Sequence, residues 1–346
     1  MIRFKLQFRQ GCFLMELASV LVVTRNNRQT IERNLGSIFR QSYKNIEVVI
    51  VDSSDDGSSS IIRRSIEDGN INNFDVKYVY EEPRGVGAAR NTAINHSSGK
   101  YLFFVDSDFY VDEDYVQRAV EIFSSDDRIL SISIHKDFYP SENGFFSDAI
   151  FLFDKARLPM QPIDRFEYWI CQRKTFDLVG LFISDLKAGE DNEWEGRANK
   201  VLRDLYADQG FKVAIAPEIV SHEEKQCWSV SEYWKKLVWY GTKFAHLNYF
   251  RSTLSTSIAE FVLMLSQISF PFVAFYHFSI SSLGYIFALP VVFFLLPSLF
   301  IAIRAVKRKI VSRSLVLIPL LVFYKAFFIL GGFFSEIGRR VATQFK

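Results

Sequence analysis

The sequence predicts an α/β domain built on a mainly parallel sheet, followed by an α-helical membrane domain. Up to about residue 105, short apolar runs rich in β-branched residues alternate with segments of helical spacing. This alternation is typical of parallel strands with helices on both faces of the sheet. From about residue 258 onward, the apolar residues merge into long runs. We therefore expect an N-terminal extension at residues 1–17, the α/β domain at 18–228, an amphipathic helix at 229–252 and the membrane domain at 253–346.

The first part of the α/β domain shows its strands and helices clearly. Strands are predicted at residues 19–24, 46–51, 76–80 and 101–105, and helices at residues 28–41, 59–68 and 85–97. In such sheets, ligands bind outside the carboxyl ends of the strands. Thr24, Asp52, Asp106 and Asp108 all follow predicted strands, and we expect them to meet at a binding crevice.

Composition excludes several classes of protein. The 346 residues carry a formal net charge of only +2, which gives no sign of a nucleic-acid partner. The three cysteines lie far apart and show no CxxC spacing. This spacing argues against a disulfide framework or a thiolate metal site, and it fits a reducing compartment.

Three apolar runs predict two to three transmembrane helices. Residues 261–278 and 283–303 carry no charged side chain, and residues 315–334 carry only Lys325. About 20 such residues are needed to cross a bilayer core of about 30 Å. The five basic residues of RAVKRKIVSR (304–313) predict that this loop and the α/β domain both lie on the cytoplasmic side of a multi-pass protein of the cell membrane.

Two points of this membrane topology stay open. The C-terminal tail is basic as well, so the third run either spans the membrane or is re-entrant or interfacial. Residues 229–252 combine aromatic residues with lysines, which suits a helix at the membrane interface and equally a helix in the core of the domain.

The stretch YLFFVDSDFY (101–110) ends an apolar strand on two aspartates, Asp106 and Asp108. Burying one carboxylate is costly, and a second at close range resists joint ionisation. Either the strand has surfaced into a solvated turn, or a cation binds there.

Four fragments of the chain, taken together, resemble inverting family 2 glycosyltransferases, whose catalytic domain has the GT-A fold. They are VLVVTRNNRQTIERNLGSIFRQSYKNIEVVIVDSSDDGS, RGVGAARNTAINHSSGKYLFFVDSD, VGLFISDLKAGEDNEWEGRANK and GFKVAIAPEIVSH. Their order and spacing, between about residues 19 and 242, carry the resemblance. It implies a nucleotide-sugar donor, such as a UDP- or GDP-sugar, and a divalent metal ion, Mg²⁺ or Mn²⁺.

The resemblance also implies roles for individual residues. Asp106 and Asp108 match the DxD motif that holds the metal and the diphosphate of the sugar donor, and His222 matches a histidine near the metal. Asp52 matches a contact to the base or ribose, with Thr24 and Arg25 at the edge of that pocket; as an alternative, Asp52 is a turn residue. Arg84 and Arg90 either offset phosphate charge or pair with nearby carboxylates. Asp191 of the sequence GED matches the catalytic base, with Glu190 as the adjacent alternative, or both acids simply begin a helix.

The expected function is transfer of a single sugar to a lipid-linked acceptor at the cytoplasmic face of the membrane. The acceptor is either a polyprenyl- or dolichyl-linked saccharide or a polyprenyl phosphate. The QxxRW motif of processive family members is absent from the sequence, which favours one transfer over polymer synthesis. The alternative is a catalytically inactive GT-A-like membrane scaffold or nucleotide-sugar-binding protein.

Overall fold

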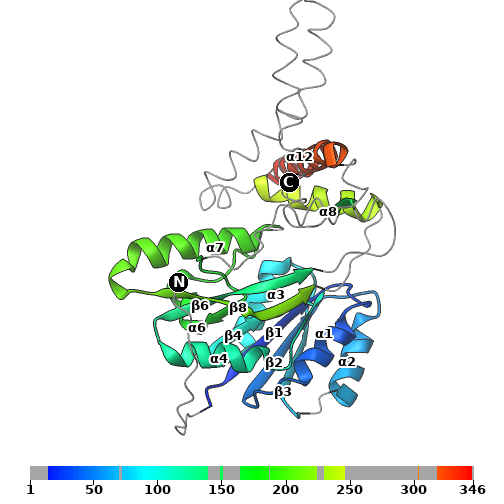
Figure 1. Ribbon diagram of the computed structural model, residues 1–346. Helices are drawn as coiled ribbons and strands as arrows, with labels where there is room; N and C mark the ends of the chain where they lie inside the picture. The colour runs from blue at the N-terminus through cyan, green and yellow to red at the C-terminus, as the bar shows by residue number, and fades with distance from the viewer. Residues whose placement is uncertain are drawn as a thin grey trace, which may run out of the picture.

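The computed structural model describes residues 15–69, 72–138, 149–150, 164–186, 188–223, 230–245, 303 and 318–344. These residues form a layered α/β domain and, beside it, a pair of helices that contact each other (Figure 1). The predicted segments 1–14 and 246–302 fall outside the described residues.

The first half of the domain confirms every element that the sequence predicts there. The elements are β1 (Ala18–Thr24), α1 (Ile31–Phe39), β2 (Ile46–Asp52), α2 (Ser58–Gly69), β3 (Asp75–Tyr80), α3 (Val86–His96) and β4 (Tyr101–Phe104). β1 pairs in parallel with β2 and β4, and β2 pairs in parallel with β3. The carboxyl ends of β1, β2 and β4 therefore meet at one edge of the sheet, as expected for this class of fold.

The second half makes the sheet mixed. It contains β5 (Phe109–Val111), α4 (Tyr115–Ser125), β6 (Ile129–Phe138), β7 (Ile170–Gln172), α6 (Arg173–Val179), α7 (Glu190–Lys200) and β8 (Lys212–Glu223). Over the described residues the strand order is β3-β2-β1-β4-β7-β6-β8-β5. β7 runs antiparallel to β4 and β6, and β5 runs antiparallel to β8, whereas β6 and β8 are parallel. The predicted parallel pairing is confirmed for β1 to β4, whereas the short strands β5 and β7, which were not predicted from the sequence, pair antiparallel and make the sheet mixed.

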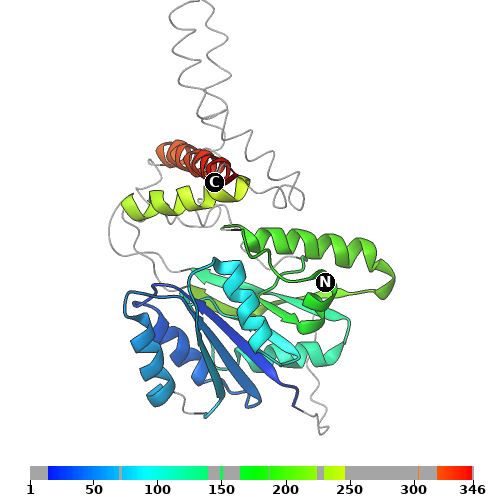
Figure 2. The ribbon, with the colours of Figure 1, turned by 180° about the vertical axis from the view of Figure 1, so that it is seen from behind.

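Two hydrophobic cores lie on the two faces of this sheet. Along β1, Val20 and Val22 pack into the core with α1, α2 and α4, whereas Leu21 packs into the core with α3, α6 and α7. The two views in Figures 1 and 2 show these helices on opposite faces. The alternation follows from the two-residue period of a strand. The result is a three-layer domain whose sheet is buried on both sides.

The close approach of α3 to the 182–183 segment explains a small residue in the sequence GVGAAR. A Cβ atom added to Gly87 would lie 2.9 Å from the carbonyl oxygen of Ile183. The absence of a side chain at Gly87 therefore allows this close packing. The same contact brings α3 next to the segment that leads into α7.

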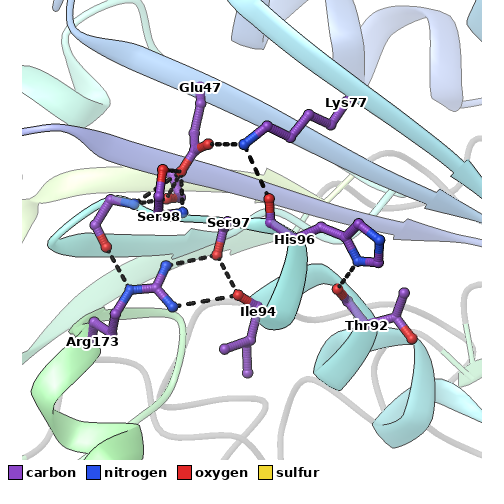
Figure 3. Close-up of polar contacts among 10 residues, drawn as sticks. Glu47, Lys77, Thr92, Ile94, His96, Ser97, Ser98 and Arg173 are labelled. Atoms are coloured by element: carbon purple, nitrogen blue, oxygen red, sulfur yellow. Dashed lines mark hydrogen bonds and ion pairs between the residues drawn. The ribbon is translucent and has the colours of Figure 1, made fainter.

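A network centred on Glu47 fastens the amino ends of β1, β2 and β4, at the opposite edge from the candidate site (Figure 3). The carboxylate of Glu47 accepts hydrogen bonds from Ser19 Oγ (2.6 Å), Lys77 Nζ (2.7 Å) and the backbone N–H groups of Ser98 (2.5 Å) and Gly99 (2.9 Å). Burial by itself raises the pKa of Glu47, but these hydrogen bonds outweigh it and lower the pKa to about 2.

This network predicts an acid-sensitive stability. Because the folded pKa of Glu47 lies below its ordinary value of 4.5, its contribution is fully present above pH 4.5 and is lost as the pH falls toward 2. We expect Glu47→Gln to remove roughly 3 kcal/mol of unfolding free energy at pH 7 and much less at pH 3. Urea unfolding at the two pH values measures this. Glu32→Gln, at an exposed pair with Arg64, is the matched control, and an equal loss in both variants would contradict the assignment.

α8 (Val230–Gly241) and α12 (Ile318–Gln344) cross at close range. A Cβ atom at Gly241 would collide with the carbonyl oxygen of Ile329, and one at Gly332 would collide with that of Val238. The rings of Trp234 and Phe328 lie 5.6 Å apart. Thus α12 covers one side of α8, the helix that the sequence predicts at the interface or in a core.

The membrane prediction falls largely outside the described residues. The apolar runs 261–278 and 283–303 are not described apart from residue 303, whereas α12 overlaps the third run, 315–334. In the part of the chain that the structure describes, no helix has both the length and the apolar character that crossing a membrane requires.

Candidate active site

The carboxyl ends of β1 and β2 form one wall of the candidate site. Thr24 lies opposite Asp52 in the register of the two strands, and the backbone carbonyl of Thr24 accepts a hydrogen bond from Ser53 N at 3.0 Å. The Thr24 hydroxyl is buried and has no hydrogen-bond partner among the described residues. A buried hydroxyl without a partner is costly, so Thr24 is a candidate for contact with a bound molecule. Arg25, the next residue, is exposed.

Asp52 is fully buried and its carboxylate is already engaged. It accepts hydrogen bonds from Ser54 N (2.9 Å), Ser59 Oγ (2.5 Å) and Tyr78 Oη (2.8 Å). These contacts agree with the alternative that Asp52 shapes the turn after β2. Its direct contact with a base or ribose stays a prediction.

Residues of α1 and of the loop before it donate hydrogen bonds to the turn that contains Asp106 and Asp108. The Asn34 side chain donates to the carbonyl oxygens of Asp106 (3.0 Å) and Phe109 (2.7 Å). The Thr30 hydroxyl donates to the carbonyl oxygen of Ser107 at 2.8 Å, and the Asn27 side chain donates to Ser107 Oγ. These contacts fix the backbone of the turn, and none of them uses the carboxylate of Asp106 or Asp108.

Arg90 joins this turn to the start of α7. Its guanidinium lies 3.1 Å from Asp106 Oδ1 and 2.6 Å from Glu190 Oε1, and the side chain is only 4% exposed. The rings of Tyr168 and Phe182 flank it, with centroids 4.7 and 5.6 Å away. Of the two alternatives for Arg90, pairing with carboxylates is thus the one observed. The pairing brings two distant sequence motifs, DSD and GED, into one site.

Asp108 lies in an acidic surrounding. Burial, together with the nearby carboxylates of Asp106 and Glu223, raises the pKa of Asp108 to about 7, and Lys236 opposes this in part. A divalent cation would relieve that repulsion, and carboxylate oxygens are the ligands that Mg²⁺ and Mn²⁺ prefer. No group of three acidic, histidine or cysteine side chains that could hold a metal occurs within the described ranges. The residues present therefore fit a metal that takes its remaining ligands from substrate phosphates and water, as Mg²⁺ commonly does.

The two acids at the start of α7 have different surroundings. Gly189, with a left-handed backbone (φ 76°), precedes the helix, and Glu190 is buried against Arg90. Asp191 is less buried than Glu190, and its Oδ1 accepts hydrogen bonds from Asn192 N (2.7 Å) and Asn192 Nδ2 (3.1 Å). The positive end of the helix dipole stabilises carboxylates in this first turn. Glu190 is thus engaged in an ion pair and Asp191 is the more exposed of the two acids, while the role of either as the catalytic base stays a prediction.

His222 and Arg84 both lie close to carboxylates of the α/β domain. His222 stacks on the ring of Tyr110, with centroids 4.8 Å apart, and its nitrogens lie 3.3 Å from Asp112 and 3.7 Å from Asp137. Its role as a metal ligand stays a prediction. Arg84 is exposed and pairs with Glu81 at 2.6 Å, which is the second of its two alternatives.

Sequence reasoning missed the residues that support the turn and one cation beside it. Asn34 is a buried polar residue on the apolar side of α1, a signal that could have been recognised. Lys136, on β6, lies with its ammonium 3.4 Å from the centroid of the Trp169 ring, and it interacts electrostatically with Asp106 and Asp191. Nothing in the spacing of Lys136 or Trp169 along the chain indicates that they meet.

Comparison with known proteins shows which family the first part of this chain is similar to. Residues 19–187 match the family described as Glycosyl transferase family 2. The glycosyltransferase GlyA of Streptococcus pneumoniae is 34% identical over 129 residues, which is 37% of this chain and 18% of that protein. The UDP-Glc:alpha-D-GlcNAc-diphosphoundecaprenol beta-1,3-glucosyltransferase WfaP of Escherichia coli is 32% identical over 127 residues, 36% of this chain and 49% of WfaP. The chain thus spans less than half the length of these relatives.

A solved structure supports the same fold. The mannosyltransferase PcManGT from Pyrobaculum calidifontis, in complex with GDP-Man and Mn²⁺, has a TM-score of 0.52 and 18% sequence identity. The likeness covers 93% of this chain and 87% of that protein. At this identity the comparison establishes the α/β GT-A fold with its mixed sheet and nothing further.

Proposed function

We propose that this chain, whose residues 19–187 match glycosyl transferase family 2, belongs to that family and transfers a single sugar from a nucleotide diphosphate sugar to a lipid-linked acceptor. The observation that carries the proposal is the double ion pair of Arg90. It places the carboxylates of the DSD turn and of the GED helix start around one guanidinium. A carboxylate pair for the diphosphate side and a separate carboxylate for the acceptor side are the parts that an inverting transfer needs.

Each residue of the site has a separate role in the proposed transfer. Asp106 and Asp108 would hold a divalent metal, which, when bound, supplies charge that stabilises the departing nucleoside diphosphate. Asp191 takes the proton of the acceptor hydroxyl at a carboxylate oxygen as that hydroxyl attacks the sugar carbon. Glu190 does not take this proton; it holds Arg90 in place beside Asp106. The buried Thr24 hydroxyl lies on the wall where the nucleoside would bind.

The proposed acceptor is supported by the names of similar proteins, and the proposed membrane location is supported by the apolar runs of the sequence. WfaP, by its name, acts on a sugar linked to undecaprenol through a diphosphate, and PcManGT was solved with GDP-Man and Mn²⁺. The apolar runs 261–278 and 283–303 suit a chain whose acceptor is confined to a bilayer. We therefore propose a multi-pass protein of the cell membrane with the α/β domain on the cytoplasmic side, and with α8 near the interface.

Replacing each of the two acids at the start of α7 by its amide distinguishes their roles. We expect Asp191→Asn to lower kcat by about a thousandfold, within the range for loss of a general base, while binding of the sugar nucleotide is kept. Glu190→Gln should lower stability together with activity, because it leaves Arg90 partly unpaired in a buried place. Initial rates and thermal unfolding of both variants make the comparison. Equal rates for Asp191→Asn and the wild type would exclude Asp191 as the base.

The sugar donor is tested by thermal unfolding of the purified full chain in detergent. UDP, GDP and dTDP are each added with and without Mn²⁺, and a ligand at 100 times its dissociation constant should stabilise the protein by about 2.7 kcal/mol. Stabilisation by one nucleotide that requires Mn²⁺, followed by sugar transfer from the corresponding donor, would support the proposal. Nucleotide binding without transfer would favour a nucleotide-sugar-binding protein, and no response to any nucleotide would favour an inactive scaffold.

A further inference from the structure

Lys136 is a cation at the site that forms no ion pair with any of the described residues. Its ammonium lies 3.4 Å from the centroid of the Trp169 ring. Among the described residues it forms neither a hydrogen bond nor an ion pair, although the side chain is partly buried. An ammonium in such a place gains from an anion more than an exposed lysine does, because water screens it less.

Three of the four acids around Lys136 already have their own cations, and Asp191 is the one that forms no ion pair among the described residues. Arg165 lies 2.5 Å from Glu195 and 3.8 Å from Glu167. Arg90 pairs with Asp106 and Glu190. Asp106, Glu167 and Glu195 therefore do not need the positive charge of Lys136 for their own neutralisation.

The position of Lys136 in the sheet indicates which substrate it faces. Thr24 and Asp52 end β1 and β2, on one side of β4, whereas Lys136 is on β6, on the other side of β4 beyond β7. Lys136 interacts electrostatically with four carboxylates, those of Glu167, of Asp106 in the DSD turn, and of Glu195 and Asp191, which lie one helical turn apart on α7. The unpaired ammonium is thus on the side of the proposed base and away from the wall where the nucleoside would bind.

We propose that Lys136 binds the diphosphate of a lipid-linked saccharide acceptor, with Trp169 as the residue that positions its ammonium. This inference rests on the proposed sugar transfer and narrows its acceptor class. In a saccharide joined directly to a lipid diphosphate, the anion lies about one sugar ring from the hydroxyl that attacks. An ammonium within electrostatic reach of the base suits that spacing. The acceptor is then a short lipid diphosphate saccharide, whose anion is close to its reacting hydroxyl.

Binding in the absence of metal and sugar donor tests this assignment. Two probes are used with the full chain in detergent and EDTA: GlcNAc diphosphate linked to farnesol, and the neutral farnesyl glycoside of GlcNAc. Titration calorimetry should show that the wild type prefers the charged probe. We expect Lys136→Met to weaken binding of the charged probe about tenfold to a hundredfold, the usual worth of a hydrogen bond to a charged group, and to leave the neutral probe unchanged. Lys136→Arg should keep most of the preference.

Lys174→Met is the matched control, because Lys174 also lies over an aromatic ring, that of Phe211 at 4.8 Å, but on α6. It should bind both probes as the wild type does. The response of each variant to UDP and GDP with Mn²⁺ separates the two sources of diphosphate. Loss of that response in Lys136→Met with charged-probe binding intact would assign Lys136 to the sugar donor and overturn the proposal. If Lys136→Met does not fold, binding of the two probes to the wild type tests the proposal instead. A preference of the wild type for the charged probe below about twofold would also overturn the proposal.

The proposed transfer can fail independently of this site. A wild type that responds to no nucleotide but prefers the charged probe would refute the transfer and retain the lipid diphosphate site at Lys136. A wild type that transfers sugar with equal efficiency to the charged and neutral probes would retain the transfer and refute the role of Lys136.

Discussion

Replacing Asp108 by asparagine is expected to abolish the Mn²⁺-dependent response to nucleotides and to lower kcat/KM by about a thousandfold, or about 4 kcal/mol of transition-state stabilisation. The variant keeps the size of the side chain and removes the charge that would hold the metal. A nucleotide at 100 times its dissociation constant should stabilise the wild type by about 2.7 kcal/mol, and this stabilisation should disappear in the variant. Asp114→Asn, at an exposed pair with Arg118, is the surface control and should respond to nucleotides as the wild type does.

The same substitution should have the opposite effect on the protein without ligands. The raised pKa of Asp108, about 7 against an ordinary 3.8, means that its contribution to stability is present below pH 3.8 and is lost as the pH rises through 7. Asp108→Asn removes that loss, so the metal-free variant should be at least as stable as the wild type at pH 8. Urea unfolding at pH 6 and pH 8 measures this. A variant that is less stable than the wild type at pH 8 would show that Asp108 serves the fold rather than a ligand.

The half of the sheet that forms the nucleotide wall could be predicted from the sequence because its strands are buried on both faces. β1, β2 and β4 contain the apolar runs 20–23, 48–51 and 101–105, which are followed directly by Thr24, Asp52 and Asp106, so both the strands and their carboxyl ends could be recognised. β5 and β7 have only three residues each. A period of two cannot be recognised over three residues, and antiparallel pairing of such strands depends on contacts distant in the sequence.

The candidate site could be predicted only in part, for a similar reason. The acids of DSD and GED were visible as motifs, but the residue that joins them had two open alternatives until the structure placed Arg90 between Asp106 and Glu190. On β6, Lys136 follows a segment in which serine and isoleucine alternate. A lysine after such a segment ordinarily points into solvent near the end of the strand. Its meeting with Trp169 depends on the pairing of strands from distant parts of the chain, which local pattern does not encode.

The Arg90 ion pairs should be among the largest single contributions to the stability of the site. We expect Arg90→Met to lower the free energy of unfolding by about 3 to 5 kcal/mol, because it leaves the buried carboxylate of Glu190 without a partner and deprives Asp106 of its own. Arg84→Met is the control: Arg84 is 62% exposed in its pair with Glu81, and such pairs contribute about 0 to 1 kcal/mol. Equal losses in the two variants would contradict a structural role for Arg90.

A double-mutant cycle separates two contributions to the loss of stability: the lost ion pair between Arg90 and Glu190, and the cost of leaving the Glu190 carboxylate buried and unpaired. In the Arg90→Met background, Glu190→Gln should recover part of the lost stability, because it replaces a buried, unpaired acid by a neutral amide of the same shape. In the wild-type background the same change should destabilise the protein. A coupling energy of about 0.5 to 3 kcal/mol is expected for residues in direct contact. Arg90→Lys should not rescue activity, since one ammonium cannot reproduce the planar fork that reaches Asp106 and Glu190 together. Additive losses in the cycle would mean that the guanidinium stabilises the site through Tyr168 and Phe182 instead, and that the two carboxylate motifs are held together by the backbone alone.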